Sequence, residues 1–232
     1  MVYSPSENVS VLKYTKQLGG LYTTIRDRST PRQEFRFAAD RIIYNLVEEA
    51  LNLLPTRPKK VITPLGEEFE GAEFEGKICA VPIMRAGLAM ANAVEQVCPN
   101  IRIGTTLIQR DEETAEPIEH YAKLPRDISK RYVLLLDPML ATGGSAERAI
   151  NRLMGNGVKE PKIIFVNLIS CPEGLQRLED RCSQIQIVTG VIDKGLNGRK
   201  YIVPGLGDFG DRYFGTDEKH TNRRRKRSTV KV

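Results

Sequence analysis

The sequence predicts an α/β fold in which a parallel sheet is flanked by helices on both faces. Two observations support this prediction. Short apolar runs of strand length alternate along the chain with segments of helical periodicity. The runs are apolar at nearly every position, which is typical of strands that are covered on both faces. Ligands of such sheets bind beyond the carboxyl ends of the strands, so residues that directly follow the runs are the first candidates for a site.

The composition indicates one folded domain followed by a basic tail. The chain has 232 residues, of which 41% are hydrophobic and 28% charged, as in an ordinary globular protein. We expect a single domain over residues 1–216. Seven basic residues and no acid lie in the last fourteen positions, so residues 1–218 carry a net charge of −1 against +6 for the whole chain. We expect residues 217–232 to be a solvated, disordered tail, with a nuclear signal at Arg223–Arg227 or a nucleic-acid contact as the alternatives.

Several classes of protein fit poorly. No apolar stretch is long enough to cross a membrane and no secretory signal pattern opens the chain, so we expect a cytoplasmic protein without a membrane contact. No G-x-S-x-G motif indicates a serine hydrolase. Neither a zinc site nor a Cys–His pair is indicated, because the two histidines lie far apart and the four cysteines lack CxxC spacing: Cys79, Cys98, Cys171 and Cys182.

The expected elements follow from periodicity and from helix and turn signals. Residues 9–28 look irregular. Thr30 is placed to cap a long helix that reaches Leu54, with Pro31 in its first turn and Gln33 closing a capping box. Residues 61–76, interrupted by proline and glycine, predict a hairpin or loop. The other expected strands are 77–84, 101–108, 132–136, 162–169 and 185–192, and the other expected helices are 88–97, 145–154 and 173–181.

The segment from Gln109 to Arg131 is too polar for a core and longer than most connections. Long loops of this kind are often functional lids or disordered insertions. We therefore expect a mobile segment here.

The strongest candidate site follows the apolar run of residues 132–136. Asp137 ends this run, and a turn of small and hydroxyl residues, Ala141–Ser145, leads into the next helix. The backbone N–H groups of such a turn and the positive end of the helix are suited to one phosphate. Arg85 ends an earlier strand and Arg110 begins the polar segment, and guanidinium groups pair bidentately with phosphate. An ordinary strand–turn–helix is the alternative.

Two literal motif matches fail in their context. Residues 205–210 read GLGDFG and match GxGxxG, yet a βαβ unit is not indicated around them, because Pro204 precedes them and DRYFGT leads toward the end of the chain. The DFG within this stretch lacks every other kinase motif. What remains is a glycine-rich turn with two acids, Asp208 and Asp211, whose backbone could approach a flat ligand closely. A surface turn with solvated acids is the alternative.

Together these residues resemble the uracil phosphoribosyltransferases. The resemblance rests on three motifs in the family's order, VPIMRAGL (81–88), DPMLATGGSA (137–146) and YIVPGLGDFGDRYFGT (201–216), and it extends over about residues 9–216. It implies the type I phosphoribosyltransferase fold, a parallel sheet flanked by helices with a small hood and a mobile loop or β-arm. The hood would be formed from the N-terminal and C-terminal segments of one domain.

The resemblance also implies an activity. The family converts uracil and 5-phospho-α-D-ribose 1-diphosphate (PRPP) to uridine monophosphate (UMP) and diphosphate in pyrimidine salvage. The cofactor would be Mg²⁺, held mainly through the diphosphate of PRPP and not by a protein metal site. GTP would be a candidate activator, and the enzyme would be a homodimer or homotetramer.

Site residues follow from the three motifs. The catalytic residues would be Asp137, Asp208 and Arg110. Uracil would bind Ile202, Gly207, Asp208 and Phe209, largely through their backbone. PRPP would bind Arg85, Arg110, Asp137, Pro138, Met139, Leu140, Ala141, Thr142, Gly143, Gly144, Ser145 and Asp208.

Two positions bear on which member of the wider family this is. Related type I enzymes often carry two adjacent acids in the ribose motif, whereas Pro138 follows Asp137 here, as in the uracil branch. Phe209 stands where many bacterial members have alanine, so the shape of the base pocket is open.

Two alternative functions remain. One is a transferase for a purine or orotate, which base-dependent diphosphate release would identify. The other is a nucleotide-sensing regulator whose tail binds RNA, which a gel shift with and without residues 219–232 would test.

Overall fold

The computed structural model describes residues 3–99, 101–110 and 117–216. Its centre is a sheet in the order β1-β11-β10-β8-β4-β6-β7, parallel throughout except for the antiparallel pair β6–β7. Short β5 pairs with β4, and short β9 pairs with β10. The strands are β1 Val9–Val11, β4 Lys77–Met84, β5 Arg102–Ile103, β6 Thr105–Arg110, β7 Pro117–Lys123, β8 Arg131–Leu136, β9 Met139–Leu140, β10 Ile163–Ser170 and β11 Gln186–Ile192.

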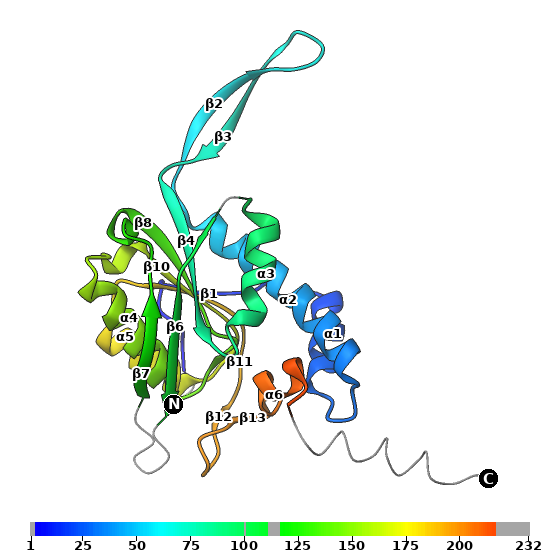
Figure 1. Cartoon of the computed structure of the whole chain (residues 1–232). Coiled ribbons are helices and arrows are strands. Elements are labelled where there is room, and N and C mark those ends of the chain that lie inside the picture. The colour runs from blue at the N-terminus through cyan, green and yellow to red at the C-terminus, as the bar shows by residue number, and fades with distance from the viewer. Residues whose placement is uncertain (1–2, 100, 111–116, 217–232) are drawn as a thin grey trace, which may run out of the picture.

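Helices cover both faces of this sheet, which confirms the predicted fold class (Figure 1). One face is covered by α1 (Lys16–Arg26), α2 (Arg32–Asn52) and α3 (Leu88–Val97), and the other by α4 (Gly144–Gly155) and α5 (Pro172–Arg181). Successive residues of β8 belong to opposite cores. Leu134 and Leu136 pack with α1, α2 and α3, whereas Val133 and Leu135 pack with α4 and α5. The central strands β4, β8 and β10 are apolar at most positions because both of their faces are buried.

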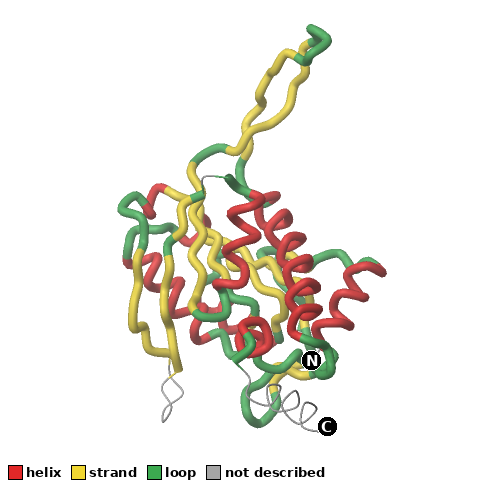
Figure 2. Tube along the Cα trace, turned by 45° about the vertical axis from the view of Figure 1, so that its right-hand side comes forward, coloured by secondary structure: helices red, strands yellow, loops and turns green. Residues whose placement is uncertain are grey.

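A long hairpin, β2 (Thr56–Ile62) with β3 (Glu68–Phe74), stands out from the body of the molecule (Figures 1 and 2). Its strands pair antiparallel with each other, and every residue of β2 is exposed. The hairpin leads directly into β4, so it lies at the amino end of that strand. This confirms the hairpin alternative for residues 61–76 and extends it toward the N-terminus.

The remaining elements are short. The segment after β11 forms β12 (Gly195–Leu196), β13 (Ile202–Val203) and helix α6 (Phe209–Phe214). Two 3-10 turns, η1 (Ile128–Lys130) and η2 (Glu160–Lys162), precede β8 and β10. The strands predicted at 77–84, 132–136, 162–169 and 185–192 and the helices predicted at 88–97, 145–154 and 173–181 are confirmed within one or two residues at each end.

The expectation that residues 9–28 are irregular is wrong. They contain edge strand β1 and helix α1, whose N-cap Thr15 accepts a hydrogen bond from the backbone N–H of Leu18 at 3.1 Å. Adjacent Gly19 and Gly20 lower the helix propensity of this stretch and mask its signal. The helix forms because its other face is buried, as Leu18, Leu21, Tyr22 and Ile25 show.

The predicted capping of the long helix is also wrong. Helix α2 begins at Arg32, and Pro31 at its N-cap makes no side-chain hydrogen bond. The hydroxyl of Thr30 donates instead to the carbonyl oxygen of Thr24 at 2.7 Å, which ties the start of α2 to α1. The helix ends at Asn52, two residues before the predicted Leu54.

Residues 101–131 depart from the prediction of one strand followed by a loop. Gly104 separates β5 from β6, and a Cβ at this glycine would lie 3.0 Å from the side chain of Leu124. Strand β7 then returns antiparallel to β6, so most of the polar segment is a β-arm and not a structureless lid. Its polarity suits an edge strand with an exposed face. The tip, residues 111–116, lies outside the described residues, and its mobility stays a prediction.

Candidate active site

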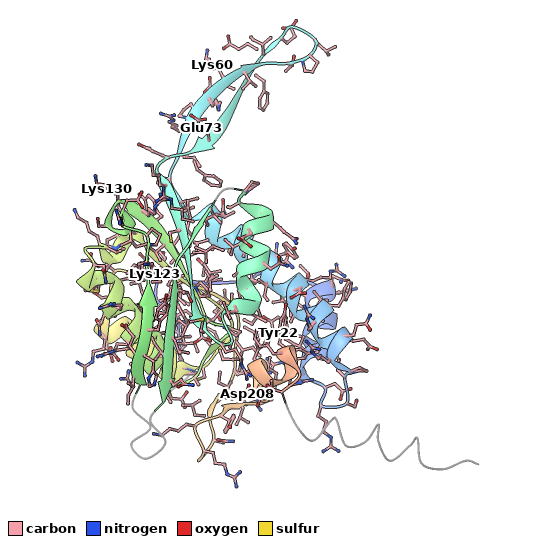
Figure 3. The ribbon with its side chains drawn as sticks, viewed as in Figure 1. Tyr22, Lys60, Glu73, Lys123, Lys130 and Asp208 are labelled. Atoms are coloured by element: carbon pink, nitrogen blue, oxygen red, sulfur yellow. The ribbon has the colours of Figure 1, made fainter. Side chains whose placement is uncertain are left out.

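The carboxyl ends of the parallel strands meet at the edge of the sheet opposite the β2–β3 hairpin. Arg85 follows β4 and Asp137 follows β8, and the pairing of Pro82 with Leu136 brings these two strand ends side by side. The approach is close, because a Cβ added to Gly87 would lie 2.3 Å from the carbonyl oxygen of Leu136. Figure 3 labels Asp208 at this end of the molecule and Lys60 on strand β2 of the hairpin, at the opposite end.

The turn after Asp137 is built on the backbone of β10. The carbonyl oxygen of Pro138 accepts hydrogen bonds from the N–H groups of Leu168 and Ile169 at 3.0 and 3.1 Å. The carboxylate of Asp137 accepts one from the N–H of Met139 at 3.2 Å. The half-buried carboxylate is therefore held at the strand end by its own turn.

The small-residue turn Ala141–Ser145 sits at the N-terminus of α4. Gly143 occupies the N-cap with φ +77°, in the left-handed region that favours glycine, and it brings no side chain to the first N–H groups of the helix. Beneath the turn, the carbonyl oxygen of Ala141 accepts from the thiol of Cys171 at 3.1 Å. A Cβ on Gly174 would lie only 2.5 Å from the same oxygen. The first N–H groups of a helix are suited to an anion, and the role of this turn as a phosphate site stays a prediction.

The glycine-rich C-terminal segment is fastened to the same edge by a charged pair that the sequence reasoning missed. Asp193, which follows β11 and is 7% exposed, accepts two hydrogen bonds from Arg26 of α1 at 2.7 and 2.9 Å. It also accepts from the N–H of Gly205 at 2.8 Å, while Arg26 donates to the carbonyl oxygen of Gly205 at 2.9 Å. The sequence does contain a signal for Asp193, because this residue directly follows an apolar run, as Asp137 does.

Two of the predicted uracil-binding residues direct their side chains into the core. Ile202 is 7% exposed and Phe209 is 2% exposed. The ring of Phe209 packs against the rings of Phe35 and Tyr213, with centroids 5.5 Å away in both cases. Only the backbone of Phe209 is therefore available to a ligand. Neighbouring Asp208 is exposed and caps α6.

Arg85 reaches across to this C-terminal segment. Its guanidinium donates to the carboxylate of Asp211 at 2.7 Å and to the hydroxyl of Thr216 at 3.0 Å. The hydrogen bond from Thr216 and the pairing with Arg85 hold the pKa of Asp211 below its usual range. A Cβ on Gly210 would lie 3.3 Å from both Arg85 and Asp208. The structure thus brings Arg85 and Asp208 together.

Arg110 ends β6, which runs parallel to β4 and points to the same edge. Its side chain lies outside the described part of the structure, so its predicted role as an anion clamp stays a prediction.

No metal cage is preformed in the described part of the chain. Among residues 3–99, 101–110 and 117–216, no three His, Cys, Asp or Glu side chains are grouped to hold an ion. The carboxylates at or near this edge are Asp137, Asp193, Asp208 and Asp211, and two of them pair with arginines: Asp193 with Arg26 and Asp211 with Arg85.

A groove of about 710 Å³ lies elsewhere on the molecule. It runs between residues 12–18 and α2, and Thr56 and Phe74 at the base of the hairpin contribute to its lining. Neither Arg85, Asp137 nor Asp208 lines this groove, which is therefore distinct from the candidate site.

Comparison with known proteins adds independent findings. A sequence model of the family "uracil phosphoribosyltransferase" matches residues 12–216. Uracil phosphoribosyltransferase 1 of Schizosaccharomyces pombe is 59% identical over 209 residues, which cover 90% of this chain and 95% of the relative. The structure of the AQ2163 protein from Aquifex aeolicus aligns with a TM-score of 0.79 at 34% identity, over 89% of this chain and 97% of that one.

More distant likeness concerns the fold alone. The adenine phosphoribosyl transferase of Trypanosoma brucei aligns with a TM-score of 0.53 at 14% identity, over 88% of this chain and 89% of that one. The order of strands and the layering of helices described above are therefore those of a type I phosphoribosyltransferase.

Proposed function

The chain belongs to the uracil phosphoribosyltransferase family, and from this premise we propose how its own residues perform the reaction. The enzyme is a pentosyltransferase that joins uracil to the ribose of PRPP, giving UMP and diphosphate in pyrimidine salvage. One observation carries the assignment of residues. Asp137 with its phosphate turn, Arg85, and the C-terminal segment with Asp208 all lie at one edge of the sheet.

PRPP is assigned to the turn after β8. The 5′-phosphate binds at Ala141–Ser145, where the N-terminus of α4 supplies N–H groups and the positive end of the helix dipole. Asp137 holds the ribose hydroxyls, because its carboxylate is fixed by Met139 at the strand end. Pro138 to Leu140 complete the wall with backbone anchored on β10.

The two arginines are assigned to the diphosphate. Arg85 follows β4 and Arg110 ends β6, the neighbouring parallel strand, so both belong to the carboxyl edge. Breaking the bond between the anomeric carbon and diphosphate leaves positive charge on the sugar and negative charge on the leaving group. Guanidinium groups stabilise that negative charge as it develops, so the reaction depends on positioning and electrostatics more than on a strong base.

Uracil is assigned to the backbone of Ile202 and of Gly207 to Phe209. Gly207 has φ +84°, a conformation that exposes its backbone and disfavours other residues. Uracil presents alternating carbonyl and N–H groups at its edge, and backbone groups can read that edge by hydrogen bonding. Because the Phe209 ring lies in the core, its size does not narrow the base site. Within this segment, the carboxylate of Asp208 lies on the same side of Gly210 as the guanidinium of Arg85, since a Cβ on Gly210 would lie 3.3 Å from both.

The residues present fit a role for Mg²⁺. This ion keeps several waters and is usually bound through one or two carboxylates plus substrate phosphates, and Asp208 is an exposed carboxylate that could serve in this way. When bound to the diphosphate of PRPP, Mg²⁺ supplies neutralising charge to the leaving group.

The proposal extends to assembly, regulation and location. We propose a homodimer or homotetramer in which the β2–β3 hairpin contacts another copy, since it exposes Val61, Ile62, Leu65, Phe69 and Phe74. GTP as an activator and a cytoplasmic location follow from the resemblance to the family. No helix within the described residues is long and apolar enough to cross a membrane. The tail with Arg223–Arg227 lies outside the described residues.

The test is UMP formation from uracil and PRPP, with orotate and hypoxanthine as competing bases and with Mg²⁺ removed by a chelator. We expect product with uracil alone, and loss of activity without Mg²⁺. Asp137→Asn should lower kcat about 100-fold or more while the far-UV circular dichroism and thermal midpoint stay as in the wild type. Near-wild-type turnover by this variant would refute the assignment of Asp137.

A further inference from the structure

The guanidinium of Arg85 is hydrogen-bonded to two residues of the C-terminal segment, Asp211 and Thr216. One NH group of the guanidinium donates to the carboxylate of Asp211 at 2.7 Å, and the other donates to the hydroxyl of Thr216 at 3.0 Å. The hydroxyl of Thr216 donates in turn to the same carboxylate oxygen at 2.6 Å, which closes a three-membered network. The ring of Phe214 lies 5.7 Å from the guanidinium carbon.

We propose that Asp211 and Thr216 are positioning residues: they orient Arg85 for the diphosphate of PRPP and couple the binding of PRPP to the segment that binds uracil. The inference rests on the proposed role of Arg85 at the diphosphate. It goes further by giving a function in the reaction to two residues outside both substrate sites.

The orientation follows from the donors of the guanidinium. Arginine carries five N–H donors in a planar fork, and Asp211 and Thr216 engage two of them. The side chain of Arg85 is 48% exposed, and without partners a long side chain at such a position would sample many rotamers. Two contacts fix the plane of the guanidinium group. Its remaining N–H donors then already have a set orientation, which favours bidentate binding of a phosphate group.

The coupling follows from where Asp211 lies. It belongs to the first turn of α6, and its backbone N–H donates to the carboxylate of Asp208 at 2.8 Å. Gly207, Asp208 and Phe209 immediately precede or begin this helix. A diphosphate that draws Arg85 toward itself therefore acts on Asp211, and through α6 on the backbone assigned to uracil. Coupling between two sites is reciprocal, so uracil must favour diphosphate binding by the same factor.

In the competing interpretation, Asp211 and Thr216 only stabilise the position of the C-terminal segment. The two interpretations predict different effects of mutation on stability and on substrate affinity. A fastening contact would alter stability and both substrates alike. A positioning contact alters the affinity for diphosphate and the dependence of uracil binding on diphosphate, while uracil affinity in the free enzyme stays the same.

The experiment uses the full chain with Asp211→Asn, Thr216→Val and Thr216→Ser. Glu179→Gln is the matched control, because it removes a hydrogen-bonded carboxylate on α5 that contacts Tyr3 and Ser6 far from the site. Calorimetry gives the affinity for inorganic diphosphate with Mg²⁺, and the affinity for uracil with and without diphosphate. Inorganic diphosphate and uracil cannot react with each other, so both measurements are at equilibrium. Thermal midpoints identify variants that fail to fold.

In the wild type, diphosphate should tighten uracil binding. Asp211→Asn and Thr216→Val should weaken diphosphate about fivefold, the upper range for an exposed ion pair, and bring the ratio of the two uracil affinities toward one. Thr216→Ser, which keeps the hydroxyl, should restore both values, and Glu179→Gln should change neither.

The inference would be overturned if Asp211→Asn and Thr216→Val left the ratio of uracil affinities with and without diphosphate unchanged. It would also be overturned if diphosphate did not change uracil affinity in the wild type. Arg85→Gln separates this failure from that of the proposed function. If Arg85→Gln weakens PRPP and diphosphate strongly while Asp211→Asn does not, the inference alone fails. If Arg85→Gln binds PRPP as the wild type does, the assignment of Arg85 fails and the inference falls with it.

Discussion

Gly174 lies directly beneath the phosphate turn, and the turn can occupy its position because this residue has no side chain. A Cβ here would lie 2.5 Å from the carbonyl oxygen of Ala141 and 2.9 Å from both the side chain and the carbonyl oxygen of Leu140. Two of these three neighbours are backbone atoms, which cannot turn away as a flexible side chain can. Any larger residue must displace either the turn or the start of α5.

Gly174→Ala should therefore impair PRPP binding more than it impairs folding. We expect KM for PRPP to rise about tenfold, because small displacements of a positioning element have large effects on turnover. Gly20→Ala is the matched control, since a Cβ there meets nothing within 4 Å inside helix α1. It should leave KM unchanged and raise the free energy of unfolding by roughly 0.5–1 kcal/mol. Equal KM values for the two variants would contradict the role of Gly174.

A local sequence pattern identified some of the candidate site residues and missed others. Asp137 and Arg85 could be proposed from the sequence because each follows an apolar run, and the structure places both at the carboxyl edge of the sheet, where such folds bind ligands. Asp193 carries the same signal, yet its role depends on Arg26, 167 residues away in the chain. A pairing over that distance leaves no local pattern. The inward direction of the Phe209 ring was equally hidden, because it depends on Phe35 of α2.

Among the elements, prediction succeeded where burial on both faces made most positions of a strand apolar, as in β4, β8 and β10. It failed where an element depends on one tertiary contact. Helix α1 forms despite two adjacent glycines because its buried face packs on α2, and edge strand β1 has only three residues. Strand β7 is polar enough to be taken for a loop, because its only neighbour in the described sheet is β6.

The junction of η1 and β8 gives a prediction about pH. Arg131 is 5% exposed, donates twice to the carboxylate of Asp127 at 2.8 and 2.9 Å, and donates to the carbonyl oxygen of Ile78 at 3.0 Å. The hydrogen bonds from Arg131 lower the pKa of Asp127 to about 2. A carboxyl whose pKa is lowered by folding stabilises the protein above its unfolded pKa, and this stabilisation is lost as the pH falls toward the folded value.

Asp127→Asn should therefore lower the thermal midpoint at pH 7, where buried Arg131 loses its counter-charge. The difference between the variant and the wild type should shrink as the pH falls from about 4 to about 2. Glu68→Gln is the control, because its pair with Lys60 is exposed on the hairpin and should contribute little at any pH. A difference that stays constant down to pH 2 would show that the Asp127 charge is not responsible.

In the whole molecule, the N-terminal and C-terminal segments meet at the carboxyl edge of the sheet, where the proposed site lies. Arg26 of α1 joins Asp193 and Gly205, and Arg212 of α6 donates to the carbonyl oxygens of Leu206 at 2.7 Å and Asp27 at 2.6 Å. Residues at opposite ends of the sequence thus jointly determine the position of the segment assigned to uracil.

Arg26→Gln tests whether the position of the segment assigned to uracil depends on Arg26. The variant leaves the carboxylate of Asp193, whose side chain is 5% exposed, without its charged partner. We expect the free energy of unfolding to fall by about 2–3 kcal/mol, below the value for a fully buried pair because Arg26 keeps some solvent exposure. Urea denaturation measures this loss. Uracil affinity should fall more than diphosphate affinity, and the opposite order would contradict an anchoring role on the base side.

The hairpin lies at the opposite end of the molecule from the proposed site, so a role in assembly can be tested separately from catalysis. Its strands pair only with each other in the described structure, and Figure 3 labels Lys60 and Glu73 far from Asp208. Five large apolar side chains on it are between 44% and 90% exposed. Exposed apolar groups gathered on a projecting element are costly in water and are typical of a contact surface.

Replacing Ile62 and Phe69 by aspartate should therefore lower the molar mass measured by light scattering to that of one chain. The secondary structure of the body should persist, because neither residue packs in its cores: Ile62 is 69% and Phe69 59% exposed. Lys60→Gln, on the same hairpin, is the control and should leave the mass unchanged. If the double variant keeps the mass of the wild type, the hairpin is not the contact. If the mass falls and turnover persists, all the groups needed for the reaction lie within one chain. A loss of turnover with retained folding would instead mean that the neighbouring copy stabilises the active edge through the sheet.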